Sequence, residues 1–419
     1  MRLLLATLTP LLGLFIWRSR YTFFYNIITK MDLPDGYYYE GEVTSHCHPM
    51  NSAPNLPFKY CEDASFWDHY DTDGKLEERR VVVSCDSGRR EWNTVMGPLL
   101  DPIPRGSLWI YSPVSGETTH LTLENFPAEH TFHPLGVEIY PSYSGNASYM
   151  YVVNHAANKT VIEQFRVSPS SSVAKHIRTL SHPFFIASNA LALTSPTSFY
   201  VTNDHVFTKR LPYVGAVLPM VETVLGIPLS FAGHVIINPD ETDETAVLSH
   251  NVVAPFVAFS NGLSISPSGL ELAIASTSIG TVYFYSRNTS TNALTFSTSV
   301  QLPFPPDNVK YDHDGNLVVS GHPHFPTLLQ LVAGKVDIAP SWVVSISRIE
   351  GAVTAEYDLN APLSASTIVP SPANHTLQTL FQSNGKFFTS STSGLIDTLS
   401  GNLYVTGLYA EDGAIICHP

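Results

Sequence analysis

Short stretches in which hydrophobic and polar residues alternate recur along the chain and predict β-hairpins. In residues 306–322, Val309 and Tyr311 alternate with polar residues, 312–315 reads as a tight turn, and 317–320 is the return strand. Related hairpins are predicted from residue 188, from residue 260 and around 394–401. A hairpin repeated at irregular intervals is typical of a propeller, whose sheets stack radially around an axis. The sequence therefore predicts an all-β propeller.

Oxygen-bearing side chains stand at the entry of these hairpins. Asp307 and Asn308 immediately precede one strand, and Asn189 and Asn261 hold equivalent places in two earlier hairpins. The innermost strands of a propeller point at a common axis, so we expect these four side chains to converge. Carboxylate and amide oxygens are the ligands of Ca²⁺, which takes about six to eight of them. The alternative is that Asn and Asp before Gly only form turns, but four at matched positions favour a calcium site.

Composition narrows the class of protein. Only 14% of the 419 residues are charged, while Gly, Pro, Tyr and Phe are plentiful, which suits many short strands and argues against long charged helices. We find no linker that divides residues 31–419, so a single propeller domain is expected. The net charge of −14 argues against nucleic-acid binding, and the basic pairs at 79–80 and 89–90 are interpreted as solvated loop charges. Residues 212–227 have helical spacing and predict a core or lid helix, with membrane contact as the alternative.

Residues 1–30 predict a signal anchor or a signal peptide. The apolar run 3–17 is flanked by Arg2, Arg18 and Arg20 and is shorter than the roughly 20 residues of a spanning helix. No clear cleavage site follows, so we favour a retained anchor and contact with a membrane or lipid surface through this segment. Four Asn-x-Ser/Thr sequons support entry into the secretory pathway, towards the ER lumen or the cell exterior. These candidate glycosylation sites are Asn146, Asn158, Asn288 and Asn374.

The four cysteines allow three disulfide pairings in an oxidising compartment. Cys61 opens one predicted strand and Cys85 ends the next, so an antiparallel hairpin would place them side by side. That leaves Cys47 with Cys417, a bond that closes almost the whole chain into a ring, as a propeller needs when its first and last strands share a sheet. Zinc is the competing use of these cysteines, but no C-x₂-C spacing exists.

Acidic and histidine residues near other strands are further candidates. Glu62 and Asp63 open the strand that follows Cys61, where an inward role and surface decoration are equally plausible. His133 lies in a segment with a second histidine at position 130, and His155 is expected in the tight connection of a hairpin. A solvated side chain is the alternative to a catalytic one for a histidine in a turn.

Together these segments resemble the serum paraoxonase/arylesterase family, six-bladed propellers with a retained N-terminal hydrophobic helix that hydrolyse lactones and aryl esters with calcium. The matching phrases run in family order from about residue 45 to the C-terminus. They are CED at Cys61, VVNHAANKTVIEQF at Val152, the Asn189 segment with FYVTNDH, FSNGLSISPSG at Phe259, PPDNVKYDHDGNLVVSGHP, and the terminal Cys417.

The resemblance implies roles for particular residues. It places His155 in the family's histidine pair and Phe259 in the aromatic wall of the pocket, and it agrees with a bond between an early cysteine and Cys417. The catalytic-calcium ligands that it implies are Glu62, Asn189, Asn261, Asp307 and Asn308.

Two departures from the family pattern change the expected site. The motif FNPHG, whose histidine is the family's general base, reads FHPLG here, so Leu135 stands at that place in the pocket and His133 lies two residues earlier. Residues two apart in a strand share a face, so His133 could reach the same cavity. The Asn-Asp pair of the family's second, structural calcium reads Asn-Ala here, which leaves only Asp63 and the Val137 carbonyl of that site. A second ion is therefore doubtful.

The leading hypothesis is a calcium-dependent hydrolase of aryl esters or lactones. In it, a metal-bound substrate carbonyl is attacked by water that His155, Glu62 or His133 activates. No G-x-S-x-G elbow is present, which weighs against a serine esterase. The alternative from another class is a membrane-tethered propeller that keeps calcium for rigidity and acts as a binding module, a role that Leu135 favours. A sugar-lactonase or strictosidine-synthase-like propeller fits the fold but not the matched phrases.

Overall fold

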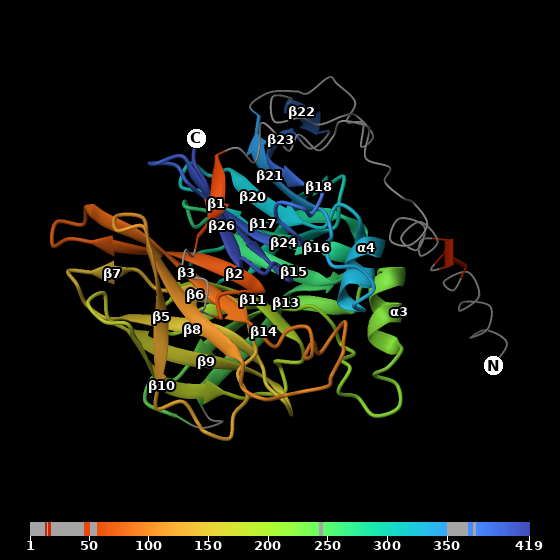
Figure 1. Cartoon of the computed structure of the whole chain (residues 1–419), viewed down its shortest axis with the longest axis horizontal. Coiled ribbons are helices and arrows are strands. Elements are labelled where there is room, and N and C mark those ends of the chain that lie inside the picture. Colours follow the sequence, from red (N-terminus) through yellow and green to blue (C-terminus); the bar gives the residue numbers. More distant parts are fainter. Residues whose placement is uncertain are drawn as a thin grey trace.

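The alternating segments form strands that belong to five sheets within the residues that the computed structural model describes, 13–14, 16–17, 46–50, 57–242, 246–349, 368–371 and 374–419 (Figure 1). In chain order the strands are β1 (Cys47–Pro49), β2 (Cys61–Tyr70), β3 (Leu76–Asp86), β4 (Gly106–Ser112), β5 (Glu117–Glu124), β6 (Pro134–Ile139), β7 (Ser142–Tyr143), β8 (Ser148–His155), β9 (Thr160–Val167), β10 (Val173–Leu180), β11 (Ser188–Ser195), β12 (Ser198–Asn203), β13 (Ser230–Ile237), β14 (Val247–Val257), β15 (Ser260–Ile265), β16 (Glu271–Ser276), β17 (Thr281–Arg287), β18 (Leu294–Gln301), β19 (Pro306–Tyr311), β20 (Leu317–Gly321), β21 (Ser341–Arg348), β22 (Ile368–Ser371), β23 (His375–Ser383), β24 (Ser391–Asp397), β25 (Asn402–Gly407) and β26 (Ala414–Cys417). The four predicted hairpins are β11–β12, β15–β16, β19–β20 and β24–β25, and their antiparallel pairing confirms them.

The sheets surround a common axis in a propeller-like arrangement. Three sheets are antiparallel runs that begin with β11, β15 and β19, and a fourth combines β24, β25, β26 and β1. The nine-stranded sheet joins two antiparallel runs, β2-β3-β4-β5 and β6-β8-β9-β10, through a parallel pair between β5 and β10, and β7 adds a parallel edge strand beside β2. The first strands β2, β6, β11, β15, β19 and β24 contact one another in this order, and β24 returns to β2. The all-β, propeller-like prediction is therefore confirmed.

Glycines allow the first strands to approach one another closely around the axis. A Cβ atom on Gly136 of β6 would lie 2.3 Å from the carbonyl oxygen of Asn189 in β11. A Cβ atom on Gly262 of β15 would lie 2.5 Å from the Cα atom of Asn308 in β19. Any larger residue at these two positions would push apart the strands that carry the candidate ligands.

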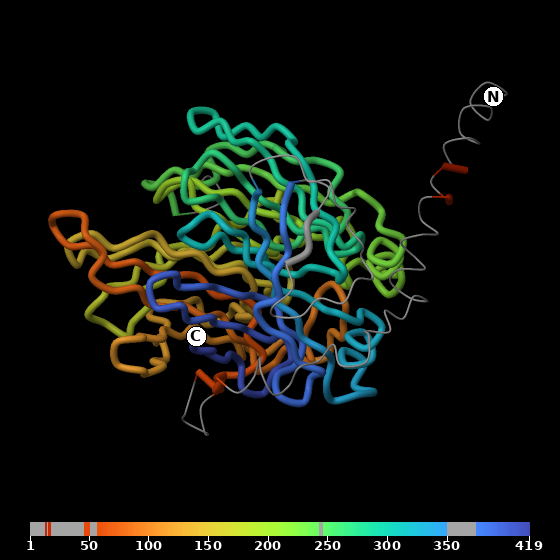
Figure 2. Tube along the Cα trace, turned by 90° about the horizontal axis from the view of Figure 1, so that it is seen from above, coloured from red at the N-terminus to blue at the C-terminus, as the bar shows by residue number. Residues whose placement is uncertain are grey.

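Two disulfides hold the N-terminal part of the described chain. Cys61 and Cys85 face each other across β2 and β3, and Cys47 and Cys417 face each other across β1 and β26. Both predicted pairings are therefore confirmed. Figure 2 shows the first and last strands of the chain together, so the sheet of β24 to β26 is completed by a strand from the other end of the sequence.

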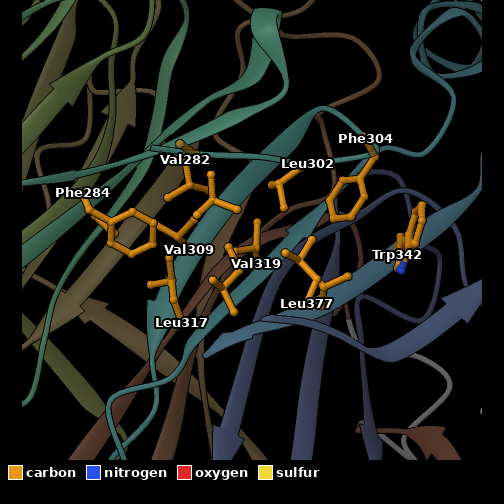
Figure 3. Close-up of a cluster of buried hydrophobic side chains, with 14 residues drawn as sticks. Val282, Phe284, Leu302, Phe304, Val309, Leu317, Val319, Trp342 and Leu377 are labelled. Carbon is orange, nitrogen blue, oxygen red and sulfur yellow. The ribbon is translucent and has the colours of Figure 1, made fainter. Parts of the chain in front are cut away.

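The hydrophobic core lies between neighbouring sheets. Between the sheets of β15–β18 and β19–β23, Phe304 and Trp342 lie 4.7 Å apart between ring centroids, and Val282, Val309 and Leu377 are fully buried around them (Figure 3). Each such side chain contributes about 1.5–3 kcal/mol to the stability of the fold. Because the sheet faces are occupied by apolar side chains, the polar residues of the first strands concentrate at the axis.

Two helices differ from the sequence-based expectation. The predicted helix 212–227 is shorter, because α3 spans only Leu218–Leu225, after a turn in which Tyr213 has a positive φ of 64°. α4 (Phe325–Val332) was not predicted, although Pro326 in its first turn and His324 as its N-cap mark its start. Among the described residues, no helix has the length and apolar character needed to cross a bilayer. The expected anchor at 1–30 lies outside the described residues apart from 13–14 and 16–17.

Candidate active site

Each candidate ligand lies at a point where the regular pairing between its strand and the neighbouring strand is interrupted. The pairing register of β2, β11, β15 and β19 shifts near the start of every one of these strands, which is the mark of a β-bulge. A bulge turns a side chain out of the alternating pattern and so re-aims it, here towards the axis. The residues that lie within these shifts include Glu62, Asn189, Asn261, Asp307 and Asn308.

These bulges surround a cavity. Glu62, Asn189, Asn261 and Asp307 line it, and each is at most 5% exposed. Asn308 joins them, because its Nδ2 donates a hydrogen bond of 3.0 Å to Oε1 of Glu62. The structure therefore brings together all five residues that the sequence singled out, although they span 247 positions.

Three buried oxygens of this group have no hydrogen-bond donor among the described residues. They are Oε2 of Glu62, Oδ1 of Asn189 and Oδ1 of Asn261. Both amides are oriented by their NH₂ groups, since Asn189 donates to Asp204 at 3.3 Å and Asn261 donates to Thr277 at 3.0 Å. An unsatisfied buried acceptor costs about 1–3 kcal/mol. Three such oxygens at one place fit a hard cation such as Ca²⁺.

The charge of the site points to the same chemistry. Burial raises the pKa of the Glu62 carboxyl well above its usual range, and the nearby Asp63 and Asp307 carboxylates raise it further. Within the described part of the chain, no three acidic, histidine or cysteine side chains are grouped as metal ligands. The candidate donor set instead combines two carboxylates with three amides, which suits calcium better than zinc.

His133 presents a free ring nitrogen at this cavity. Its Nδ1 lies 2.9 Å from Oδ2 of Asp86, while its Nε2 is buried without a partner among the described residues. A carboxylate only accepts, so Nδ1 carries the proton and Nε2 keeps its lone pair. The other Asp86 oxygen accepts the Gly88 N–H at 2.9 Å and fixes the carboxylate. Nε2 of His133 is thus available to accept a hydrogen bond, and His133 lines the same cavity as Leu135.

His155 also lines the cavity, but both of its nitrogens are engaged. Nε2 donates to the carbonyl of Ser188 at 2.7 Å, and Nδ1 accepts from the Thr94 hydroxyl at 2.6 Å. Burial lowers its pKa to about 3, and Arg210 lowers it further. The expectation of a tight connection was wrong at this residue, because His155 is the buried last residue of β8 and pairs with Thr160. It is held as a neutral hydrogen-bonding element of the wall.

Other polar groups at the cavity were missed from the sequence. Asp86 ends β3 and meets His133 from another part of the sheet. His322 donates from Nε2 to Oδ2 of Asp307 at 2.9 Å, and Asp204 holds Asn189. Arg89 lines the cavity and donates to the Pro134 carbonyl at 2.7 Å. The interpretation of the basic pairs as solvated loop charges was therefore wrong for Arg89. It was also wrong for Arg79, which is buried in β3 and pairs with Asp68 and Asp397.

The rest of the wall is apolar. Phe259 and Leu135, both expected in the pocket, line it together with side chains from the loop after β3 and from α4. Phe259 packs edge-to-face on His205 with 4.5 Å between the ring centroids. A small polar centre inside an apolar wall suits a ligand that presents one polar group and an apolar body. The apolar residues that complete the wall are Trp92, Val95, Met96, Phe325, Leu328 and Leu408.

The model of the protein family named Arylesterase matches residues 114–377, which is more than half of the chain. The chain belongs to the arylesterase family. It is 30% identical over 200 residues to human serum paraoxonase/arylesterase 1, and 29% identical over 195 residues to chicken serum paraoxonase/arylesterase 2. Each match covers 46% of this chain and 50% of the relative, so the chain matches about half the length of these curated relatives. The resemblance that the motifs suggested is confirmed.

Solved structures of low sequence identity are also similar to this arylesterase-family chain. A luciferin-regenerating enzyme has a TM-score of 0.46 at 12% identity, covering 88% of this chain and 94% of that one. A putative gluconolactonase has a TM-score of 0.45 at 12% identity, covering 92% of this chain and 96% of that one.

A second group of acids lies directly beside the cavity. The Asp63 carboxylate accepts the Val137 N–H at 3.0 Å, and Nζ of Lys310 lies 3.2 Å from the same oxygen. The resemblance to the arylesterase family assigns Asp63 and the Val137 carbonyl to a structural calcium ion. Here an ammonium group already pairs with Asp63.

The four asparagines of the predicted glycosylation sequons are all exposed on the surface: Asn146, Asn158, Asn288 and Asn374.

Proposed function

We propose that this arylesterase-family chain hydrolyses aryl esters and lactones at the axial cavity, with one calcium ion held by Glu62, Asn189, Asn261, Asp307 and Asn308. The observation that carries the proposal is a set of three buried oxygens that have no donor within the described residues, one each on Glu62, Asn189 and Asn261. Protein groups are rarely buried unsatisfied unless a ligand completes them. When bound, the ion would supply Lewis-acid polarisation of the ester or lactone carbonyl and stabilise its developing negative charge.

His133 is the proposed general base. Its Nε2 takes a proton from water, the hydroxyl oxygen bonds to the carbonyl carbon, and the bond to the alcohol or ring oxygen breaks. The leaving oxygen then takes the proton back from Nε2, so that the products are a carboxylic acid and an alcohol. Asp86 accepts from Nδ1 at 2.9 Å, which keeps the base in the required tautomer and stabilises it when protonated. This pair replaces the histidine that Leu135 displaces.

The apolar wall supports esters and lactones with an uncharged body as substrates. Phe259, Leu135 and Trp92 surround the polar centre and exclude water from the aryl or alkyl part of the substrate. Lactones gain a further advantage, because their leaving group stays tethered to the acyl part. The small-molecule substrate is the partner proposed for the cavity.

The number of blades and the cellular route are parts of the same proposal. A six-bladed architecture is supported if the nine-stranded sheet is counted as its two antiparallel runs, because six first strands then form the ring. A secretory route is supported by two disulfides and four exposed sequons. Attachment to a membrane or lipid surface would depend on residues 1–30, which lie almost wholly outside the described part.

The test measures hydrolysis of phenyl acetate and of an aliphatic δ-lactone by the purified full chain, with calcium and with EDTA. We expect turnover that EDTA abolishes and calcium restores. Asn261→Ala removes one donor oxygen and should lower kcat/KM at a fixed low calcium concentration at least tenfold, and raise the calcium concentration required for half-maximal rate. The matched control is Asn251→Ala, because Asn251 is exposed on β14 and away from the cavity.

The binding module is the alternative that this experiment separates. A chain that binds calcium but hydrolyses neither substrate class would support a non-catalytic role and contradict the proposal. Turnover that persists in EDTA would also contradict it, because no other described group supplies the lost Lewis acid.

A further inference from the structure

A buried ammonium group lies beside the proposed calcium site. Lys310 on β19 is 7% exposed, and its Nζ lies 3.2 Å from Oδ2 of Asp63 and 3.1 Å from Oε1 of Glu138. The two acids belong to β2 and β6, which are 247 and 172 positions away from Lys310 in the sequence. One side chain therefore connects three of the first strands around the axis.

The Asp63 carboxylate is fully occupied by hydrogen-bond donors. Oδ1 accepts from the Ala64 N–H and the Ser393 hydroxyl, both at 2.8 Å. Oδ2 accepts from the Val137 N–H at 3.0 Å and from Lys310 at 3.2 Å. A carboxylate offers about four acceptor positions, so these four donors leave none for a metal ion. Glu62, its neighbour in sequence, has a buried oxygen for which the described part of the chain supplies no donor.

We infer that the Lys310 ammonium is a fixed internal cation that occupies the place of the family's second calcium in this chain, so that the chain binds at most one calcium ion at its axis. Asp63 and the Val137 segment, which the family resemblance assigns to that second ion, do not fit it here, because Asp63 pairs with Lys310 and the Val137 N–H. Glu138, the second carboxylate that contacts Lys310, accepts a hydrogen bond of 2.7 Å from the Ser65 hydroxyl.

The contacts of Lys310 are consistent with this role, because the Asp63 and Glu138 carboxylates lie 3.2 Å and 3.1 Å from its Nζ. Ala190 adds to the inference, because it stands where the family supplies an acidic ligand, and its methyl group cannot bind a cation.

The first experiment needs no variant. The full chain is treated with a chelator, dialysed against calcium, and its bound calcium is counted by mass spectrometry of the metal. At most one ion per chain is expected, and two tightly bound ions would overturn the inference. A count of zero would sink the calcium part of the proposed function, but it would support the internal cation, so the two failures are distinguishable.

The second experiment replaces the ammonium. Lys310→Met keeps the apolar stem but leaves the Asp63 and Glu138 carboxylates without their cation, and it should lower the melting temperature in EDTA by roughly 4–6 °C. Millimolar calcium should restore part of that loss and add one bound ion per chain. The matched control is Lys335→Met, because Lys335 is exposed. Its melting temperature should not change.

A double variant keeps the inference testable if Lys310→Met does not fold. Asp63→Asn with Lys310→Met removes one charge of each sign, so the chain should fold but gain no calcium ion. A Lys310→Met protein that melts like the wild type in EDTA would overturn the inference, as would a double variant that binds the additional ion.

Discussion

Replacing Asp86 with Asn tests the proposed general base without changing any of the five proposed calcium ligands. The two Asp86 oxygens accept from the Gly88 N–H and from Nδ1 of His133, each at 2.9 Å. An amide has only one oxygen, and a backbone N–H cannot become an acceptor. The Asn oxygen must therefore face Gly88, and its NH₂ group must face His133. That arrangement forces Nδ1 to accept and moves the proton to Nε2, which then has no lone pair for water.

The magnitude follows from the loss of general-base catalysis. A positioned base contributes about 10²–10⁴-fold to the rate, which is about 2.7–5.4 kcal/mol in the activation free energy. Asp86→Asn should approach the effect of His133→Gln, because both remove the same lone pair from the cavity. The loss should appear in kcat with KM changed by less than about threefold, since neither residue is proposed to hold the substrate in its ground state.

The assay compares kcat and KM for phenyl acetate at saturating calcium among the wild type, Asp86→Asn, Asp86→Glu and His133→Gln. Asp86→Glu keeps two acceptor oxygens and should recover part of the rate that Asp86→Asn loses. The control is His234→Gln. His234 is buried like His133, but it bonds to Thr194 and lies outside the cavity. If folded Asp86→Asn keeps kcat within threefold of the wild type, His133 is not the base.

Two further predictions concern stability. The double substitution Cys47→Ala with Cys417→Ala removes a disulfide that links residues 370 positions apart. On the chain-entropy model this lowers the free energy of unfolding by at most about 6 kcal/mol, so we expect a lower urea midpoint, whereas an unchanged midpoint would show that β1 adds nothing. His155 has a pKa lowered to about 3 by burial and stays neutral in the fold, while the unfolded chain takes up a proton below about pH 6.5. Its stabilising contribution is complete above that pH and falls by about 1.4 kcal/mol per unit as the pH drops towards 3. His155→Gln should therefore reduce the slope of unfolding free energy against pH between 6.5 and 4, and an identical slope would contradict the burial argument.

The strands and the convergence of the ligands could be predicted because both follow from local patterns that repeat. Alternation marks the hairpins of β15–β16 and β19–β20, and an amide or carboxylate precedes each one at a matched position. What the pattern does not contain is the bulge at the start of each first strand. The bulge depends on contacts with the neighbouring first strand, such as the approach of Gly262 to Asn308.

The remaining site residues depend on pairs that join distant segments. Asp86 lies 47 positions from His133, and Lys310 lies 247 positions from Asp63, so no spacing in the sequence connects them. His155 also depends on distant segments. The sequence placed it in the tight connection of a hairpin, whereas the fold buries the ring between Thr94 and Ser188. Burial of a polar residue is decided by which sheets meet around it.

The adjacent acids Glu62 and Asp63 have different surroundings in the fold. As neighbours across a bulge they leave β2 in different directions, so one meets the cavity and the other meets β6, β19 and β24. Asp63 has four donors, one of them the ammonium of Lys310, and is a structural anion. Oε1 of Glu62 accepts a hydrogen bond from the Asn308 amide, and Oε2 of Glu62 has no donor among the described residues. On the proposed function a cation that enters from solvent would be held at Glu62, because the charge of Asp63 is already compensated from within the chain.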